Sequence, residues 1–66
     1  MLKTRIHELR LEHGMQQAEL AKLAGVRRET ISALERGKYN PSLKLAMDIA
    51  KVFHLPVEDI FRFTDE

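Results

Sequence analysis

The sequence predicts an all-α domain of five short helices organised around a helix-turn-helix. Its 66 residues are enough for one domain, residues 1–66, and leave no room for a second. Within residues 17–36, QAELAKLAGVRRETISALER, two runs of apolar residues at helical spacing are separated only by Gly25 and Val26. Two short helices joined by a tight turn that contains glycine make a helix-turn-helix.

Small residues explain how the two helices of this motif can cross closely. The first helix carries Leu20, Ala21 and Ala24 at helical spacing, and the second carries Ile31 and Leu34. Ala21 lets the second helix approach the first, and Gly25 can adopt the positive φ that ends a helix and reverses the chain. A bulky β-branched residue at either position would push the helices apart.

Another helix is expected before the motif, from about Thr4 to His13. Thr4 can cap its N-terminus, and Ile6 and Leu9 form the stripe that faces the core. Arg10 falls on the same inner stripe, where an unpaired cation is costly. Either Arg10 finds an acidic partner inside the domain, or its long side chain carries the charge out to water.

The fourth helix is expected from about Ser42 to Phe53 or His54, after a turn at Asn40-Pro41. Its predicted core face consists of Leu43, Ala46, Ile49, Ala50 and Phe53. Leu45, Met47 and Val52 lie off that face. Surplus apolar residues on a small helix indicate a second buried side or a contact with another subunit.

The C-terminal segment predicts one more helix and a strand. The fifth helix is expected over PVEDIF, residues 56–61, with Pro56 at its first position and two acidic residues at its positive end. The tail from Phe61 to Thr64 alternates apolar and polar residues, a pattern typical of a strand. Residues 1–3 could pair with it in a small two-stranded sheet.

Composition excludes several classes of protein. The chain has no cysteine, so neither a disulfide framework nor a thiolate zinc site can hold it together. No apolar run approaches a membrane span, and the charged start does not resemble a signal peptide, so a cytoplasmic protein is expected. The three histidines lack metal-ligand spacing, and no catalytic motif is present. We therefore expect no enzyme activity, cofactor or small-molecule ligand.

The net charge of +1 is unevenly distributed. Residues 1–40 contain eight Lys or Arg against five Asp or Glu, a net +3, whereas residues 41–66 contain three against five, a net −2. Around the second helix of the motif lie Arg27, Arg28, Arg36 and Lys38. A charge cluster alone is more often a solvated face, but its coincidence with the motif indicates a surface that faces phosphates.

The motif residues resemble those of a known family. Eight positions match its pattern, namely Gln17, Ala21, Gly25, Val26, Ile31, Leu34, Glu35 and Gly37. In combination they resemble the Cro/CI-type (Xre) helix-turn-helix repressors of phages and bacteria. The whole chain is similar, without gaps, to the short stand-alone repressors typified by those of cytolysin operons, with KYNPSL at 38–43 and EDIF at 58–61 shared. The resemblance implies a lambda-repressor-like fold in which the terminal segments form a small sheet.

The resemblance also implies roles for particular residues. By position, the residues that would read base edges in double-stranded DNA are Arg27, Arg28, Glu29, Ser32 and Ala33. Those that would hold the DNA backbone are Gln17, Thr30, Lys38, Tyr39 and Asn40. Arg10 would pair with Glu35, a partly buried bridge between the first and third helices. Arg28 is the best guanine reader, because its guanidinium fork matches O6 and N7.

Two residues of the predicted DNA surface depart from the family pattern. Arg27 stands where a Ser or Thr N-cap is usual, and its guanidinium cannot accept a hydrogen bond, so it cannot cap the helix. Either a contact of Arg27 with a phosphate or a guanine compensates for the lost helix cap, or this position tolerates a residue that cannot cap. Glu29 stands where Gln is common. An acid there needs a cytosine amine, Gln17 or an arginine as partner.

The predicted activity is sequence-specific DNA binding by a dimeric transcriptional regulator, a repressor acting on a palindromic operator. The expected dimer interface consists of Leu45, Val52, Phe61 and Phe63. A homodimer would add buried apolar surface, which so short a chain needs because its own core gives only marginal stability. The alternative is a protein-binding module, such as an antitoxin that masks a toxin and binds DNA only secondarily. Only about five residues follow the fifth helix, which argues against that alternative.

Overall fold

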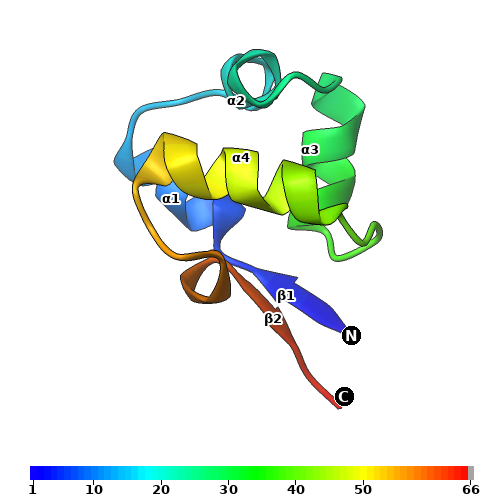
Figure 1. The fold of residues 1–66 in the computed structure, drawn as a ribbon. Helices are drawn as coiled ribbons and strands as arrows, with labels where there is room; N and C mark the ends of the chain where they lie inside the picture. The colour runs from blue at the N-terminus through cyan, green and yellow to red at the C-terminus, as the bar shows by residue number, and fades with distance from the viewer. Residues whose placement is uncertain (66) are drawn as a thin grey trace.

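The computed structural model describes residues 1–65 as four α-helices and a two-stranded sheet (Figure 1). The elements in order are β1 (Leu2–Thr4), α1 (Ile6–Glu12), α2 (Gln17–Ala24), α3 (Arg28–Glu35), α4 (Leu43–Phe53), the 3-10 turn η1 (Val57–Asp59) and β2 (Phe61–Phe63). Helix α4 crosses in front of α1, with α2 above it and α3 at its N-terminal end. None of the helices in residues 1–65 is long and apolar enough to cross a membrane.

The helices meet around one apolar core to which every α-helix contributes. The largest fully buried side chains are Ile6, Leu20, Ile31, Leu34, Ile49 and Ile60. Ala21 and Ala24 are also buried, as the close crossing of α2 and α3 requires. Gly25 ends α2 with a φ of 74°, and the N–H of Val26 bonds the carbonyl of Ala21 at 2.9 Å. The predicted helix-turn-helix is confirmed.

Helix α4 buries a different stripe from the predicted one. The Ser42 hydroxyl accepts a hydrogen bond from the N–H of Leu45 and caps the helix. From that start the buried face includes Leu45 at 6% exposure, whereas Leu43 is 74% exposed. The expectation that Leu43 lies in the core and Leu45 off it is therefore wrong. Leu43 occupies the first helical position, and the buried face of α4 begins two residues later, at Leu45.

The fifth helix and the start of the first also differ from expectation. Residues 56–61 contain only the single 3-10 turn η1, because the chain becomes extended at Phe61 to pair with β1. Helix α1 begins at Ile6, because Thr4 is the last residue of β1. The Thr4 hydroxyl still accepts a hydrogen bond from the N–H of Ile6, at 3.4 Å.

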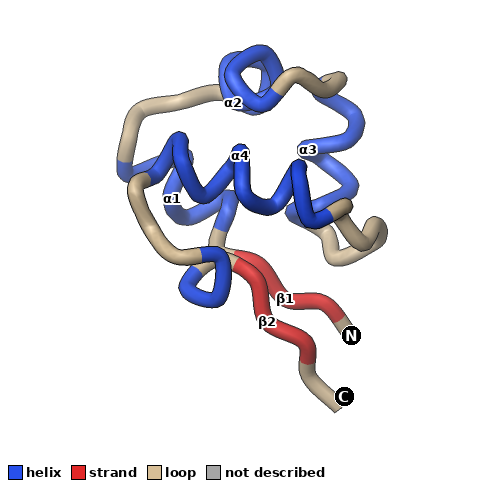
Figure 2. Tube along the Cα trace, in the orientation of Figure 1, coloured by secondary structure: helices blue, strands red, loops and turns tan. Residues whose placement is uncertain are grey.

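The terminal segments form the predicted sheet, which extends below the helices (Figure 2). β1 and β2 are antiparallel, with Leu2 opposite Phe63 and Thr4 opposite Phe61. Leu2 is buried and Phe61 packs against the core, whereas Phe63 is 68% exposed. Phe61 therefore packs on the core, whereas Phe63, at the end of β2 and opposite the buried Leu2, leaves its aromatic side chain in solvent.

The two leucines of α4 provide a matched test of this packing. We expect Leu45→Ala to lower the free energy of unfolding by about 2–5 kcal/mol, because it leaves a cavity in the core. Leu43→Ala should change it by less than about 0.5 kcal/mol, since that side chain is exposed. Urea unfolding followed by circular dichroism would measure both. Equal midpoints for the two variants would contradict the observed face of α4.

Candidate nucleic-acid interface

Helix α3 presents an exposed face opposite its buried one. Ile31 and Leu34 point into the core. The residues left on the outer side, by helical spacing, are Glu29, Ser32, Ala33 and Arg36, with Arg28 at one flank and Thr30 at the other. Arg27, Arg28 and Glu29 are exposed, while Thr30, Ser32 and Ala33 are half-buried. Four of the five predicted base readers thus lie on the outer side or flank of α3, and the fifth, Arg27, is the N-cap residue before it.

The turn between α3 and α4 carries three of the five predicted backbone-contacting residues, while Gln17 begins α2 and Thr30 lies on α3. Gly37 ends α3 with a φ of 69°, and its N–H bonds the carbonyl of Leu34 at 3.0 Å. The next N–H, that of Lys38, bonds the carbonyl of Ala33 at 2.9 Å. These two bonds satisfy the open carbonyls at the end of the helix. The side chains that follow are exposed: Lys38, Tyr39 and Asn40.

Arg10 and Glu35 lie in direct contact beneath this surface. Nε of Arg10 donates to Oε2 of Glu35 at 2.5 Å, and Nη2 donates to Oε1 at 3.2 Å. The third nitrogen, Nη1, donates to the carbonyl of Met15 at 2.8 Å. Both side chains are over nine-tenths buried. A bidentate pair of this kind sets the orientation of the partners as well as attracting them.

Gln17 connects the buried pair to the exposed face of α3. Its Nε2 donates to Oε1 of Glu35 at 3.0 Å, and its Oε1 accepts from Nη1 of Arg28 at 3.3 Å. Hydrogen bonds therefore run from Arg10 in the core to Arg28 at the surface. Each partner comes from a different place: α1, the end of α3, the first turn of α2 and the start of α3. Arg28 is thereby hydrogen-bonded to a side chain that the buried pair also holds.

The buried pair changes the acid–base behaviour of both partners. Burial alone would raise the pKa of the Glu35 carboxyl, but hydrogen bonds from Arg10 and Gln17 and the charge of Arg10 outweigh it and hold that pKa below its ordinary value. The hydrogen bond to Glu35 raises the pKa of Arg10 in turn. Glu35 is therefore ionised, and the pair charged, throughout the neutral range.

Two residues near the site were missing from the sequence-based roles. Arg36 lies on the outer side of α3, four residues after Ser32, whose carbonyl accepts from its Nε at 3.3 Å. Helical spacing alone could have added it. His7 lies with Nδ1 3.0 Å from Nη2 of Arg10 and 3.4 Å from Oε1 of Glu35. Its spacing of three residues from Arg10 on one helix was the available signal.

The start of α3 has no side-chain cap. Arg27 occupies the N-cap position with extended backbone, and its side chain makes no capping hydrogen bond. Gln16 stands in the same relation to α2. With Arg27, Arg28, Arg36 and Lys38 nearby, and Glu29 the acidic residue among them, the exposed side of α3 and its turn are basic.

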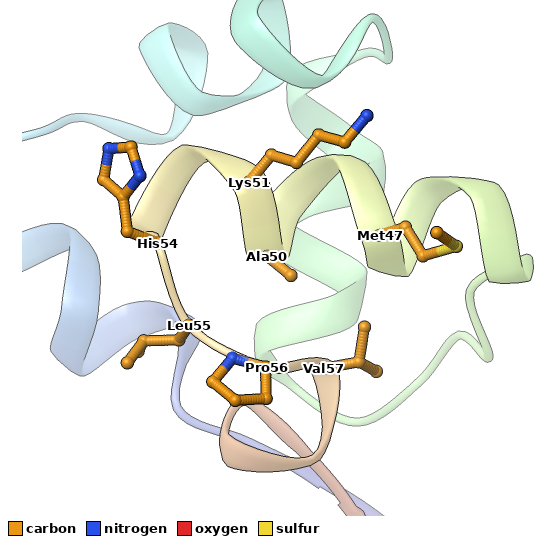
Figure 3. A pocket seen from close by; sticks show the side chains of 7 residues that line it. All are labelled: Met47, Ala50, Lys51, His54, Leu55, Pro56 and Val57. Atoms are coloured by element: carbon orange, nitrogen blue, oxygen red, sulfur yellow. The ribbon is translucent and has the colours of Figure 1, made fainter.

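A hollow in the described residues lies apart from α3. It is a groove of about 590 Å³ with α4 on one side and the segment before η1 on the other (Figure 3). Its lining is Met47, Ala50, Lys51, His54, Leu55, Pro56 and Val57. Among residues 1–65, no group of three or more acidic, His or Cys side chains is arranged to hold a metal ion.

Comparison with known proteins identifies the family. A helix-turn-helix family model matches residues 6–60, from the first residue of α1 to the residue after η1. The chain therefore belongs to the helix-turn-helix family, and it is of the Cro/CI (Xre) type of transcriptional regulator. The resemblance of the motif residues is confirmed.

Individual relatives agree with this assignment. An uncharacterized HTH-type transcriptional regulator of Archaeoglobus fulgidus is 62% identical over 65 residues, which span 98% of this chain and 93% of that protein. The restriction-modification controller protein C.AhdI from Aeromonas hydrophila superposes with a TM-score of 0.76 at 33% identity, over 83% of each chain. The N-terminal DNA-binding domain of SinR from Bacillus subtilis gives 0.74 at 34% identity, over 82% of this chain and 80% of that one.

Removing the carboxylate of the buried pair should be costly. We expect Glu35→Gln to lower the free energy of unfolding by about 3–5 kcal/mol, because Arg10 would be left as an unpaired buried charge. The matched control is Glu8→Gln, which breaks the exposed Arg5–Glu8 pair at 2.8 Å and should lower the stability far less, because water screens that pair. Thermal unfolding at neutral pH would compare the two, and near-equal losses would contradict burial of the Arg10–Glu35 pair.

The same pair predicts a pH dependence. A lowered folded-state pKa gives stability that is present above the unfolded carboxyl pKa of about 4.3 and is lost as the pH falls through the folded value. The wild type should therefore lose this stability below about pH 4.3. In Glu35→Gln the carboxyl is gone, so its stability should fall less than that of the wild type as the pH is lowered below about 4.3. Thermal unfolding of both proteins across this pH range would measure the difference.

Proposed function

We propose that this protein is a sequence-specific DNA-binding repressor that acts in the cytoplasm as a homodimer on a palindromic operator. The observation that carries the proposal is the exposed face of α3, which bears Arg28 already oriented by Gln17. A helix of this motif fits the major groove, where each base pair presents a distinct pattern of donors and acceptors. Occupying a promoter in this way would block transcription.

The surface separates into groups that fit bases and groups that fit phosphates. Arg28, Glu29, Ser32 and Ala33 would meet base edges from the outer side of α3, with Arg27 at the edge. Gln17, Thr30, Lys38, Tyr39 and Asn40 would hold the backbone on either side, and Arg36 joins them. Phosphate contacts would supply affinity and register, and base contacts would supply the choice of sequence.

The dimer is proposed to form at the C-terminal end. Phe63 is largely exposed on β2, and Val52 and Phe61 are only partly buried. Leu45 no longer belongs in this interface, because it is buried in the core of its own chain. These side chains lie on α4 and β2, so a contact there would leave α3 free. A two-fold axis would then place two copies of α3 in successive major grooves, about 34 Å apart.

Base and phosphate roles can be separated by two substitutions. Arg28→Ala should relax preference at one operator position, costing about 1–3 kcal/mol of discrimination. Lys38→Ala should weaken binding to all duplexes alike and lower the salt slope by about 1. Fluorescence anisotropy with duplexes recovered by selection from a random library would measure both effects. Equal loss of specificity from the two variants would refute the division of roles.

The oligomeric state has its own test. Wild type should sediment as a dimer at micromolar concentration, whereas Phe63→Asp should sediment as a monomer and bind the selected operator more weakly. The substitution places a charge where an apolar contact is proposed, while the folded monomer tolerates it because the position is exposed. Leu11→Asp is the control, since Leu11 is a similarly exposed apolar residue on α1. A wild-type monomer unchanged by Phe63→Asp would contradict the dimer.

A further inference from the structure

The segment that carries Lys38, Tyr39 and Asn40 is anchored only at its two ends. At the first end, the N–H groups of Gly37 and Lys38 bond carbonyls of α3. At the second end, Ser42 caps α4. Between these anchors, Tyr39 and Asn40 make no hydrogen bond to any other described residue. The position of this segment therefore depends on what lies against its anchors.

β1 lies directly against the first anchor. The carbonyl oxygen of Leu2 is 2.6 Å from the place where a β-carbon on residue 37 would stand, so only glycine fits there. This close contact is with the backbone of the strand, which cannot move aside as a flexible side chain could. The side chain of Leu2 is itself only 5% exposed. The turn after α3 therefore lies directly against the backbone of a buried residue.

The register of the sheet explains why this carbonyl faces the turn. Met1 and Thr64 exchange two hydrogen bonds across the strands, at 2.7 and 2.8 Å. Because bonded and non-bonded pairs alternate in antiparallel sheets, the next pair, Leu2 and Phe63, is a non-bonded one. The Leu2 carbonyl thus points away from β2 and toward Gly37. Pairing with β2 sets the direction in which β1 supports the turn.

We propose that β1 sets the position of the phosphate-contacting segment 38–40, with Leu2 as a positioning residue that acts through Gly37. The sheet is then part of the DNA-binding apparatus, although none of its residues is among the proposed DNA contacts. This inference rests on the proposed function, because it assigns a support to contacts that the proposal assumes. Its distinguishing consequence is that a change in the sheet alters phosphate contacts.

A pair of glycine substitutions separates this contact from backbone strain. Gly37→Ala would force the turn and β1 apart, since the new β-carbon meets the Leu2 carbonyl. Gly14→Ala is the matched control, because Gly14 has a φ of 62° and nothing within 4 Å of its added β-carbon. Both variants carry the same kind of strain, but only the first disturbs the support. Binding is measured from low to physiological salt with the duplex selected by wild type, and with an unrelated duplex of the same length.

Gly37→Ala should lower the salt slope by about 0.9 for each phosphate that the segment no longer neutralises, and weaken both duplexes by the same factor. Gly14→Ala should keep the wild-type slope. Leu2→Ala approaches the same contact from the strand and should lower the slope as Gly37→Ala does, whereas Leu9→Ala, an equally buried leucine on α1, should not. Leu2→Val takes its place if Leu2→Ala does not fold.

The outcomes distinguish this inference from the proposed function. Folded Gly37→Ala and Leu2 variants with wild-type affinity and slope would overturn the positioning role while leaving DNA binding intact. A wild-type protein with no salt-dependent binding to any duplex would instead remove the proposed function, and this inference with it. A lowered slope in Leu9→Ala as well would show a general effect of reduced stability and would also overturn the positioning role.

Discussion

The arrangement of this domain depends on the ion pair between Arg10 and Glu35. Three of the four α-helices in residues 1–65 meet there, because Gln17 of α2 bonds the same carboxylate that joins α1 to the end of α3. A buried pair is not by itself a source of stability, since both charges lose their hydration. Its effect is directional, because the guanidinium fork and the carboxylate fit in one geometry. The core holds the helices together, and the pair determines how α3 is turned.

Local signals predicted the centre of the chain well. Apolar spacing placed α2 and α3 on either side of Gly25, and the turn there follows from the need for a positive φ. The errors lie where distant segments meet. Thr4 and Phe61 are in strands because each pairs with the other end of the chain, and no local pattern carries that information. Leu43 and Leu45 were exchanged because both fit a helical stripe, and packing on α2 decides between them.

The candidate site was predictable as a set of positions but not as a set of contacts. Helical spacing places Arg28, Glu29 and Ser32 on one side of α3, and it could also have placed Arg36 there. It does not reveal that Gln17 holds Arg28, since that bond depends on how closely α2 approaches α3. The contact of Leu2 with Gly37 joins residues 35 positions apart. It follows from the register of the sheet and not from the local sequence around either residue.

The capping of the helices bears on the order in which they form. Helix α4 has eleven residues and a serine cap, whereas α2 and α3 have eight residues each and no side-chain cap. Short uncapped helices are poor nuclei, so α2 and α3 depend for their structure on packing against each other and, for α2, against α4. We therefore expect α4 to form before α2 and α3. Amide protons at the start of α3 would accordingly exchange with solvent sooner than those within α4.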